Sequence, residues 1–306
     1  MGVNYLSNIL ILGSTGMLGK MVSLVFSEYS DDNLFFTSRS KNKFNNELNG
    51  EKIIFNPNND NFDDLCEKIN PNFVINCIGA IKPTITEKKE SINNAISINS
   101  FFPLKISKKS ADLSFNYIQI GTDCVFSGLE GGYIETSTTD ATDVYRKTKI
   151  VGEISSKNKT LIRSSIVGPE SGRGMSLLNW FLKTEEPEVN GFTDHEWNGV
   201  TTLNFAKIVL GITKNEQTGI KLQHLVPSDI VNKYELLVLF QEFFSKEVKI
   251  NDVVSENKVD RTLDTIDPLA NQELWKMGGY MEIPSIRENI SELADFKGTK
   301  KILEFK

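Results

Sequence analysis

The sequence predicts an α/β protein built on a doubly wound parallel sheet, with a smaller mixed α/β lobe towards the carboxyl end. Short apolar runs alternate with helical patterns through the first half of the chain, and a glycine-rich turn follows the first run. Strands that alternate with helices favour a parallel sheet, because each crossover needs a helix to return the chain. Beyond residue 168 loops replace this rhythm, which predicts one domain over residues 1–168, with returning segments near 200–228, and a lobe formed mainly by residues 169–306.

The first predicted strand, residues 9–12, leads directly into a turn with three glycines, and a helical pattern follows through Val25. This order is typical of dinucleotide-binding sites. Glycines let the backbone approach the pyrophosphate, and the amino end of the helix offers N–H donors. We expect the cofactor to lie along the whole turn: Gly13, Ser14, Thr15, Gly16, Met17, Leu18 and Gly19.

The second predicted strand, residues 34–37, ends in Ser38, Arg39 and Ser40. A chain that binds NAD places an acidic residue at about this distance from the glycine turn, to hold the ribose hydroxyls. No acidic residue stands there, and a guanidinium can fork onto the oxygens of a 2′-phosphate. The segment therefore favours NADP(H) over NAD, the alternative being a solvated arginine in a polar loop.

Two more strands are predicted at residues 52–55 and 73–77. Asn56 follows the first of them and can bond to adenine, although an asparagine before a proline also starts turns. The second ends at Cys77 and leads into Ile78, Gly79 and Ala80, where small residues would let the chain pass under the cofactor. Residues 91–110 then predict one long helix, which contains Asn99.

Three residues further on suit the reduction of a carbonyl. Residues 113–120 predict a buried strand, so Thr122 follows its carboxyl end. A helix predicted over residues 143–155 places Tyr145 and Lys149 on one face, because positions four apart are stacked. An ammonium lowers the pKa of a nearby phenol. Tyr145 can then donate a proton while the Thr122 hydroxyl polarises the carbonyl, unless the helical pair is simply solvated.

The second half of the sequence gives weaker indications of a ligand site. A glycine-containing loop carries Arg173, and the run from 191 to 202 mixes aromatic and polar residues: His195, Trp197, Asn198 and Thr201. This run predicts either a loop that contacts a ligand or a turn buried under Trp197. Regular structure resumes with a strand at 160–163, helices at 177–182, 204–212 and 233–244, and a strand at 221–226.

Composition limits the classes of partner. The chain has 306 residues, is 39% hydrophobic and carries a formal net charge of −6, which argues against nucleic acid or an anionic membrane as its main partner. Three cysteines without a Cys-x-x-Cys pair indicate neither a disulfide framework nor a zinc site, and no metal is expected. No apolar run is long enough to span a bilayer, so we expect a cytoplasmic protein.

Several ordered motifs together resemble one family. They are the glycine turn, the run Gly121-Thr-Asp-Cys-Val-Phe-Ser-Gly128, the pair Tyr133 and Glu135, the run Tyr145-Arg-Lys-Thr-Lys149, and the run Arg261-Thr-Leu-Asp264. The chain resembles the extended short-chain dehydrogenase/reductases, and most closely the dTDP-4-dehydrorhamnose reductase family of nucleotide-sugar reductases. The match runs over almost the whole chain.

The resemblance implies a Rossmann-type cofactor domain and NADPH-dependent reduction of a nucleoside-diphosphate 4-keto-6-deoxysugar, in the synthesis of polysaccharide or glycan precursors. Thr122, Tyr145 and Lys149 match the catalytic positions, and Tyr145, Lys149 and Asn99 would also lie near the cofactor. Homodimerisation stays open. The expected substrate contacts are Asp123, Cys124, Ile166, Arg173, His195, Trp197, Asn198 and Thr201.

Two departures leave other functions open. Ile166, which follows Arg163-Ser164-Ser165, stands where the family commonly has a tryptophan, and this puts the identity of the sugar in doubt. Cys124 stands where the family commonly has a tyrosine, a feature similar to GDP-fucose synthase-like epimerase/reductases, in which His195 would be the second proton-transfer group. A third alternative is a non-catalytic NADP-binding subunit, since the regulatory subunit of methionine adenosyltransferase is similar to the same family.

Overall fold

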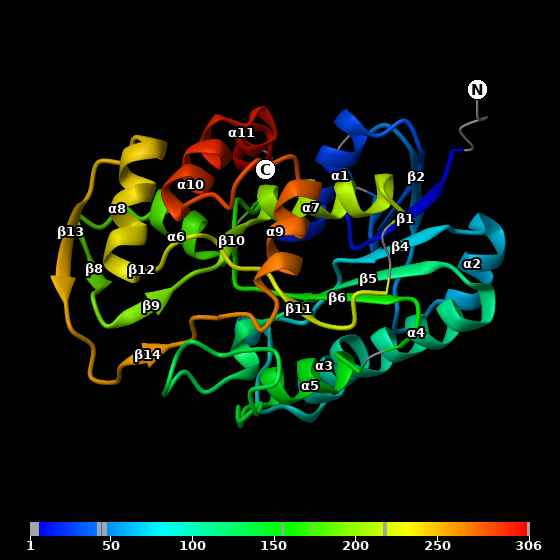
Figure 1. The fold of residues 1–306 in the computed structure, drawn as a ribbon, viewed down its shortest axis with the longest axis horizontal. Coiled ribbons are helices and arrows are strands. Elements are labelled where there is room, and N and C mark those ends of the chain that lie inside the picture. Colours follow the sequence, from blue (N-terminus) through cyan, green and yellow to red (C-terminus); the bar gives the residue numbers. More distant parts are fainter. Residues whose placement is uncertain are drawn as a thin grey trace. The chain divides into compact units, whose positions relative to one another are not determined.

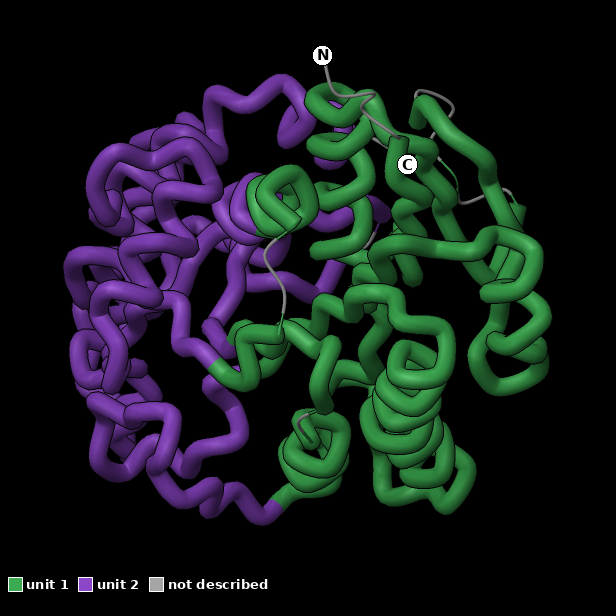
Figure 2. The backbone as a smooth tube through the Cα atoms, turned by 45° about the vertical axis from the view of Figure 1, so that its right-hand side comes forward, with its two compact units in different colours: residues 1–121, 143–162, 209–222 green, residues 122–142, 163–208, 223–306 purple. Residues whose placement is uncertain are grey.

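The chain forms two compact units, each assembled from three segments of sequence (Figure 2). The computed structural model describes residues 6–41, 44, 48–154, 156–172, 174–216 and 219–304. No helix in these ranges is long and apolar enough to cross a membrane. Unit 1 comprises residues 1–121, 143–162 and 209–222, and unit 2 comprises residues 122–142, 163–208 and 223–306. The boundary that we expected at residue 168 stays a prediction.

The large sheet has seven strands in the order β11-β6-β5-β4-β1-β2-β3. They are β1 (Asn8–Leu12), β2 (Asn33–Ser38), β3 (Glu51–Ile54), β4 (Phe73–Asn76), β5 (Asn116–Gly121), β6 (Lys159–Arg163) and β11 (Gln223–His224). Strand β1 pairs in parallel with both β2 and β4, and Ile9 lies opposite Leu34 on one side and Phe73 on the other. The chain order reverses between β1 and β4, and open sheets bind ligands at the carboxyl ends of strands at such a point. The predicted doubly wound α/β fold is confirmed.

Helices cover both faces of the sheet within unit 1. Figure 1 shows α1 on one side and α3, α4 and α5 on the other. The helices are α1 (Met17–Tyr29), α2 (Phe62–Ile69), α3 (Lys89–Ile96), α4 (Phe102–Leu113) and α5 (Val144–Gly152), with a 3-10 turn at Lys82–Thr84. Alternate strand residues such as Leu10, Leu12 and Val74 pack in one cluster with Phe62 and Phe102. Burial of these side chains fixes the register of the strands, since a shift by one residue would turn them to the opposite face.

Asn99 ties three parts of unit 1 together. Its Oδ1 accepts a hydrogen bond from the Ala80 N–H at 2.9 Å, and its Nδ2 donates to Ala80 O at 3.0 Å and to Thr148 Oγ1 at 3.2 Å. The residue itself is 2% exposed. One side chain therefore holds the segment after β4 and helix α5 in fixed relation.

The helix that carries Asn99 differs from the single long helix expected over residues 91–110. A π-helical turn, Ser97–Phe101, separates α3 from α4. Pro103 lacks an N–H for the Asn99 carbonyl four residues earlier, and its ring would crowd that carbonyl in a regular α-helix. The widened turn accommodates the proline and leaves the carbonyl facing α5. A Cβ placed on Gly152 would lie 2.0 Å from Asn99 O, so α5 can approach this closely only with glycine there.

Unit 2 has short strands and mixed helices around small sheets. Strands β7 (Ile166–Val167) and β10 (Val200–Thr201) form one pair, β8 (Glu188–Phe192) and β13 (Lys249–Val253) a second, and β12 (Val231–Asn232), β9 (His195–Trp197) and β14 (Val259–Asp260) a three-stranded sheet. The helices of unit 2 are α6 (Leu177–Lys183), α8 (Lys233–Phe244), α9 (Pro268–Met277), α10 (Ile286–Asp295) and α11 (Lys297–Glu304). Helix α7 (Thr202–Lys214) is divided, because its residues up to 208 belong to unit 2 and the rest belong to unit 1.

A buried histidine joins distant segments of unit 2. His224 Nδ1 donates to the carbonyls of Tyr133 and Asp264, at 3.1 and 2.8 Å, so Nε2 accepts from Arg163 Nη1 at 2.9 Å. Glu135 accepts from the His224 backbone N–H at 2.8 Å. Burial and the Arg163 guanidinium lower the pKa of His224, because both disfavour the imidazolium.

We predict that Asn99→Ala destabilises the protein by about 2–4 kcal/mol, because the buried N–H and C=O of Ala80 lose their partner. Urea unfolding measures the change. The matched control is Asn58→Ala, an exposed asparagine that bonds to Asn94 and Ser97, with an expected change below about 1 kcal/mol. Equal losses in the two variants would contradict the role assigned to Asn99.

We also predict a pH dependence of stability that His224 causes. An unfolded histidine has a pKa of about 6.5, and the folded value is lower, so the unfolded chain binds more protons between the two values. The contribution of His224 to stability is therefore complete above about pH 6.5 and falls as the pH decreases below it. Urea midpoints measured from pH 7.5 to 5.0 should fall less steeply in His224→Gln than in the wild type; parallel profiles would contradict this assignment.

Candidate active site

The glycine turn after β1 is tight enough to bring backbone close to a ligand. Gly13 has φ +77°, and a Cβ there would lie 2.7 Å from Ile78 Cγ1. A Cβ on Gly19 would lie 2.1 Å from Gly13 O, so the turn and the first turn of α1 touch. Helix α1 begins after Gly16, whose lack of a side chain leaves the first N–H groups of the helix uncapped. These groups are suitable donors for a phosphate.

Hydrogen bonds fasten the turn to β2. Ser14 donates to Thr37 O from both N and Oγ, each at 2.9 Å, and Gly13 N donates to Thr37 Oγ1 at 3.0 Å. Thr15 Oγ1 lies 3.4 Å from Ser38 Oγ. The turn is therefore preformed, which removes an ordering cost from ligand binding.

The loop after β2 exposes Arg39 between two serines. Ser38 Oγ donates to Ser40 O at 3.1 Å and lies 3.3 Å from Ser40 N, which bends the loop around Arg39. The guanidinium side chain is exposed, and no acidic residue stands among the five positions that follow it in the sequence. A cation without an adjacent acidic residue suits a phosphate better than ribose hydroxyls.

Asn56 forms a local turn after β3. Its Oδ1 accepts from Asn58 N at 3.2 Å, and its own N donates to Asp60 Oδ2 at 2.6 Å. This is the turn that we considered as the alternative for Asn56, and its contact with adenine stays a prediction.

The segment after β4 is held from both sides. Cys77 N donates to Leu12 O at 3.0 Å, Ile78 N donates to Asn76 Oδ1 at 3.0 Å, and Asn99 holds Ala80. Burial raises the pKa of the Cys77 thiol to about 12, so Cys77 stays a neutral thiol at physiological pH. A Cβ on Gly19 would lie 3.1 Å from Cys77 Cβ, so this segment passes close to the start of α1, and its contact with a cofactor stays a prediction.

Helix α5 presents Tyr145 and Lys149 one turn apart. The helix starts after Asp143, which accepts from Arg146 N at 2.9 Å and pairs with Arg146 Nε at 3.1 Å. Lys149 is 9% exposed, and its Nζ donates to the carbonyl of Ile120, near the end of β5, at 3.4 Å. The structure therefore brings the predicted ammonium to the carboxyl end of the strand that precedes Thr122.

A buried lysine fixes the other end of α5. Lys159 Nζ donates to the carbonyls of Gly152 and Ile154, at 2.7 and 3.0 Å, where the helix ends. Burial lowers the pKa of Lys159 to about 8, which still leaves it charged at neutral pH. A cation at the carboxyl end of a helix satisfies free carbonyls and complements the helix dipole.

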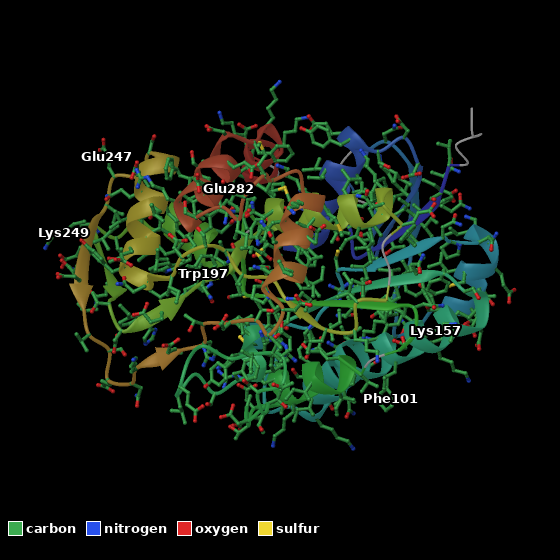
Figure 3. The ribbon with its side chains drawn as sticks, in the orientation of Figure 1. Phe101, Lys157, Trp197, Glu247, Lys249 and Glu282 are labelled. Carbon is green, nitrogen blue, oxygen red and sulfur yellow. The ribbon has the colours of Figure 1, made fainter. Side chains whose placement is uncertain are left out.

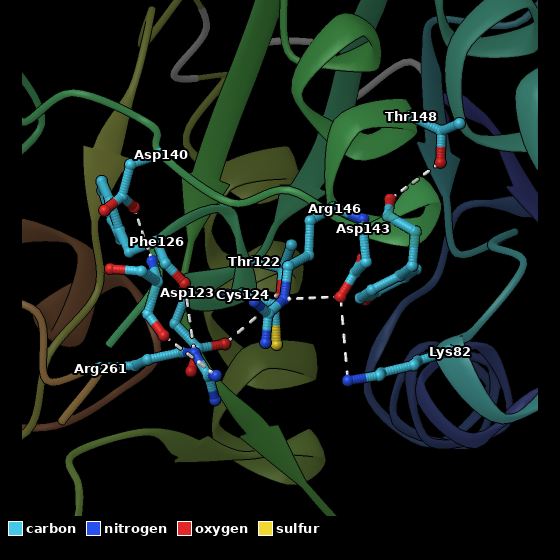
Figure 4. Close-up of polar contacts among 12 residues, drawn as sticks. Lys82, Thr122, Asp123, Cys124, Phe126, Asp140, Asp143, Arg146, Thr148 and Arg261 are labelled. Carbon is cyan, nitrogen blue, oxygen red and sulfur yellow. Dashed lines mark hydrogen bonds and ion pairs between the residues drawn. The ribbon is translucent and has the colours of Figure 1, made fainter. Parts of the chain in front are cut away.

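In unit 2, Thr122 begins a short 3-10 turn, Asp123–Val125 (Figure 4). Thr122 Oγ1 accepts from Cys124 N at 3.2 Å and lies 3.3 Å from Asp123 Oδ1. Arg261 lies beside this turn and donates to the carbonyls of Phe126 and Ser127, each at 3.2 Å. Asp123 and Cys124 thus occupy a hydrogen-bonded turn within unit 2.

The expected substrate residues of the 191–202 run have defined contacts. Trp197 Nε1 donates to Ser165 Oγ at 2.9 Å. The side-chain amide of Asn198 bonds to Leu263 as a strand partner would: Oδ1 accepts from Leu263 N at 2.9 Å, and Nδ2 donates to Leu263 O at 2.6 Å. Thr201 is fully buried, and its Oγ1 accepts from Asn204 N at 3.1 Å at the start of α7. Ile166 lies in β7, opposite Val200.

The described residues give no direct support for proton transfer by His195 or for a diphosphate contact by Arg173. His195 Nε2 lies 3.0 Å from Ser255 Oγ and 3.2 Å from Asn257 O, and its ring packs on Phe192. Arg173 lies outside the described residues. The substrate contacts that we expected from these two residues stay predictions.

Sequence reasoning missed Lys233. It is the first residue of α8, and its Nζ lies 5.3 Å from the centre of the Trp197 ring. The only sequence feature that could have drawn attention to it is the capping pair Asn232 and Glu235, which fixes where the helix begins and therefore where Lys233 stands.

Comparison with known proteins places the chain in a family. A sequence model of the RmlD substrate binding domain matches residues 7–295. Methionine adenosyltransferase 2 subunit beta of Xenopus tropicalis is 27% identical over 147 residues, 47% of this chain and 41% of that protein, so the chain spans about two fifths of this relative. Spore coat polysaccharide biosynthesis protein SpsK of Bacillus subtilis is 24% identical over 197 residues, 63% of this chain and 68% of that protein.

Solved structures share the fold at low sequence identity. A dTDP-4-dehydrorhamnose reductase of Clostridium acetobutylicum has a TM-score of 0.69 and 19% identity, over 94% of this chain and 98% of that chain. The Bacillus anthracis enzyme of the same name, in complex with NADP, has a TM-score of 0.69 and 16% identity, over 94% and 99%. MoeE5 in complex with UDP-glucose and NAD has a TM-score of 0.72 and 14% identity, over 96% and 99%. Since the family model matches nearly the whole described chain, the protein belongs to the RmlD family of extended short-chain dehydrogenase/reductases.

Proposed function

We propose that this protein uses NADPH to reduce the ketone of a nucleoside-diphosphate 4-keto-6-deoxysugar. The observation that supports this most is helix α5, where Tyr145 and Lys149 lie one turn apart and the Lys149 ammonium bonds to Ile120 O, two residues before Thr122. A phenol, an ammonium and a hydroxyl in this relation are the groups that carbonyl reduction needs. Family membership and reductases among the solved relatives favour the same reaction.

The residues of unit 1 fit a nicotinamide dinucleotide. A Cβ would block the turn at Gly13 and Gly19, and the start of α1 offers N–H groups to a pyrophosphate. The exposed Arg39 would hold a 2′-phosphate, which favours NADPH over NADH. When bound, the nicotinamide would supply a hydride to the ketone carbon.

Each catalytic residue would act on the ketone oxygen or on another catalytic residue. Thr122 would donate a hydrogen bond to that oxygen, and Tyr145 would transfer its phenolic proton as the oxygen becomes an alkoxide. Lys149 would favour the ionised form of Tyr145 and so ease the transfer. Asn99 would act indirectly, by holding α5 and the Ala80 segment.

The identity of the substrate has less support than the type of reaction. SpsK, a relative, is named for polysaccharide biosynthesis, and MoeE5, a structural neighbour, binds UDP-glucose. We therefore propose a nucleotide sugar that serves surface-polysaccharide or glycan precursors. A cytoplasmic location and a homodimer remain predictions.

A non-catalytic role is the second candidate, because one relative is the beta subunit of a methionine adenosyltransferase. In that case the protein would bind NADP without turnover. The presence of Thr122, Tyr145 and Lys149 favours catalysis. Epimerisation by Cys124 and His195 has less support, since His195 Nε2 is already bonded within unit 2.

We predict that Tyr145→Phe lowers kcat by about 10²–10⁴-fold, because the proton donor is lost while the ring remains. The assay follows the loss of NADPH absorbance with a panel of dTDP-, UDP- and GDP-linked 4-keto-6-deoxysugars, with NADH in parallel, for which we expect a lower kcat/KM.

The control for this assay is Tyr29→Phe, an exposed tyrosine at the end of α1, which should leave kcat unchanged. The Kd of NADPH should be unchanged in Tyr29→Phe, and in Tyr145→Phe, whose hydroxyl we also expect near the cofactor, it should change far less than kcat. Tight NADPH binding without oxidation by any sugar in the panel would instead support the regulatory role.

A further inference from the structure

Lys233 occupies a fixed position in unit 2. Strand β12 pairs with β9, with Val231 opposite Trp197, and Lys233 follows β12 at the start of α8. The Trp197 ring, 6% exposed and anchored to Ser165, lies 5.3 Å from Lys233 Nζ. Figure 3 shows Trp197 within the body of the unit, whereas Lys249 lies at its margin.

The charged groups around Lys233 belong to the Thr122 turn and its neighbours. Burial lowers the pKa of Lys233, a half-buried residue, to about 8, while Asp123 and Cys124 act to raise the pKa and Arg261 acts to lower it. The ammonium therefore remains largely charged at neutral pH. Carboxylates are also present nearby, because Glu196 lies opposite Asn232 in β9 and Glu235 caps the start of α8, so this cluster carries charges of both signs.

Lys233 differs from Lys159, a buried lysine whose ammonium is bonded to backbone carbonyls. Lys159 donates to two carbonyls, Gly152 O and Ile154 O. For Lys233 Nζ, by contrast, no hydrogen-bond acceptor is found within the described ranges, and its neighbours are an aromatic face and charges. An ammonium in such dense surroundings gains most from an anionic acceptor, because charge-assisted bonds are the strong ones.

We infer that Lys233, with Arg261 beside it, binds an anionic oxygen of the nucleotide-sugar substrate. The inference rests on the proposed function, which brings the sugar to Thr122 and hence to Asp123 and Cys124. In the proposed substrate this oxygen belongs to the diphosphate, because a 6-deoxysugar carries no carboxylate at C6. The Trp197 face would flank the same part of the ligand and limit its access to water.

Calorimetric titration of UDP, dTDP, UDP-glucose and UDP-glucuronic acid into the NADP-bound protein tests this inference. If the acceptor is the diphosphate, Lys233→Met should weaken binding of the nucleoside diphosphates by about tenfold or more, and Lys233→Arg should keep most of the affinity. An unchanged Kd of UDP in Lys233→Met, with loss of a preference for UDP-glucuronic acid over UDP-glucose, would contradict the diphosphate contact and would also count against a 6-deoxysugar as substrate.

The matched control is Lys249→Met, an exposed lysine of unit 2 paired with Glu188 at 3.0 Å, which should bind all four ligands as the wild type does. An unchanged Kd of NADPH and an unchanged melting temperature show that Lys233→Met is folded. Equal affinity of the wild type and Lys233→Met for all four ligands would overturn the inference alone. A wild type that binds NADPH but none of the four would overturn both the inference and the proposed substrate class.

Discussion

The bonds of one buried amide, Asn99, set the geometry on which the proposed chemistry depends. This side chain holds Ala80 and Thr148 together, and the carbonyl of the same residue faces Gly152. Because α5 is tied to the segment after β4, Tyr145 and Lys149 cannot move independently of the switch point between β1 and β4. Lys159 secures the carboxyl end of the same helix, so its position is fixed at both ends. Such rigidity is what proximity effects in catalysis require.

The fold class could be predicted because local chemistry repeats along the chain. Apolar runs such as 9–12 and 73–76 are buried strands, and the glycines at 13 and 19 are needed where backbone meets backbone. The π-helical turn could not be predicted from periodicity. Its cause, a proline four residues after Asn99, is visible in the sequence, but the helix could equally have kinked. The packing of α5 against this segment favours the π-helical turn over a kink.

The candidate site could be predicted only where its residues are close in sequence. Tyr145 and Lys149 share a helix, and helical spacing alone brings them together. Arg261 lies beside the Thr122 turn, and the register of β12, β9 and β14 brings Lys233 into the same small sheet region, which no local pattern reveals. The side chains of Asn198 and Thr201 complete backbone and helix-start hydrogen bonds that no local pattern reveals, and their contact with a ligand stays a prediction.

The proposed reaction has a direct chemical signature, transfer of a hydride from the cofactor to the carbon that bore the ketone. Incubation with NADPH deuterated at both C4 positions of the nicotinamide, followed by mass spectrometry and NMR of the sugar, measures it. A reductase would give a product with one deuterium at C4 of the sugar. A protein that binds both ligands and returns the sugar unreduced and free of deuterium would contradict the account.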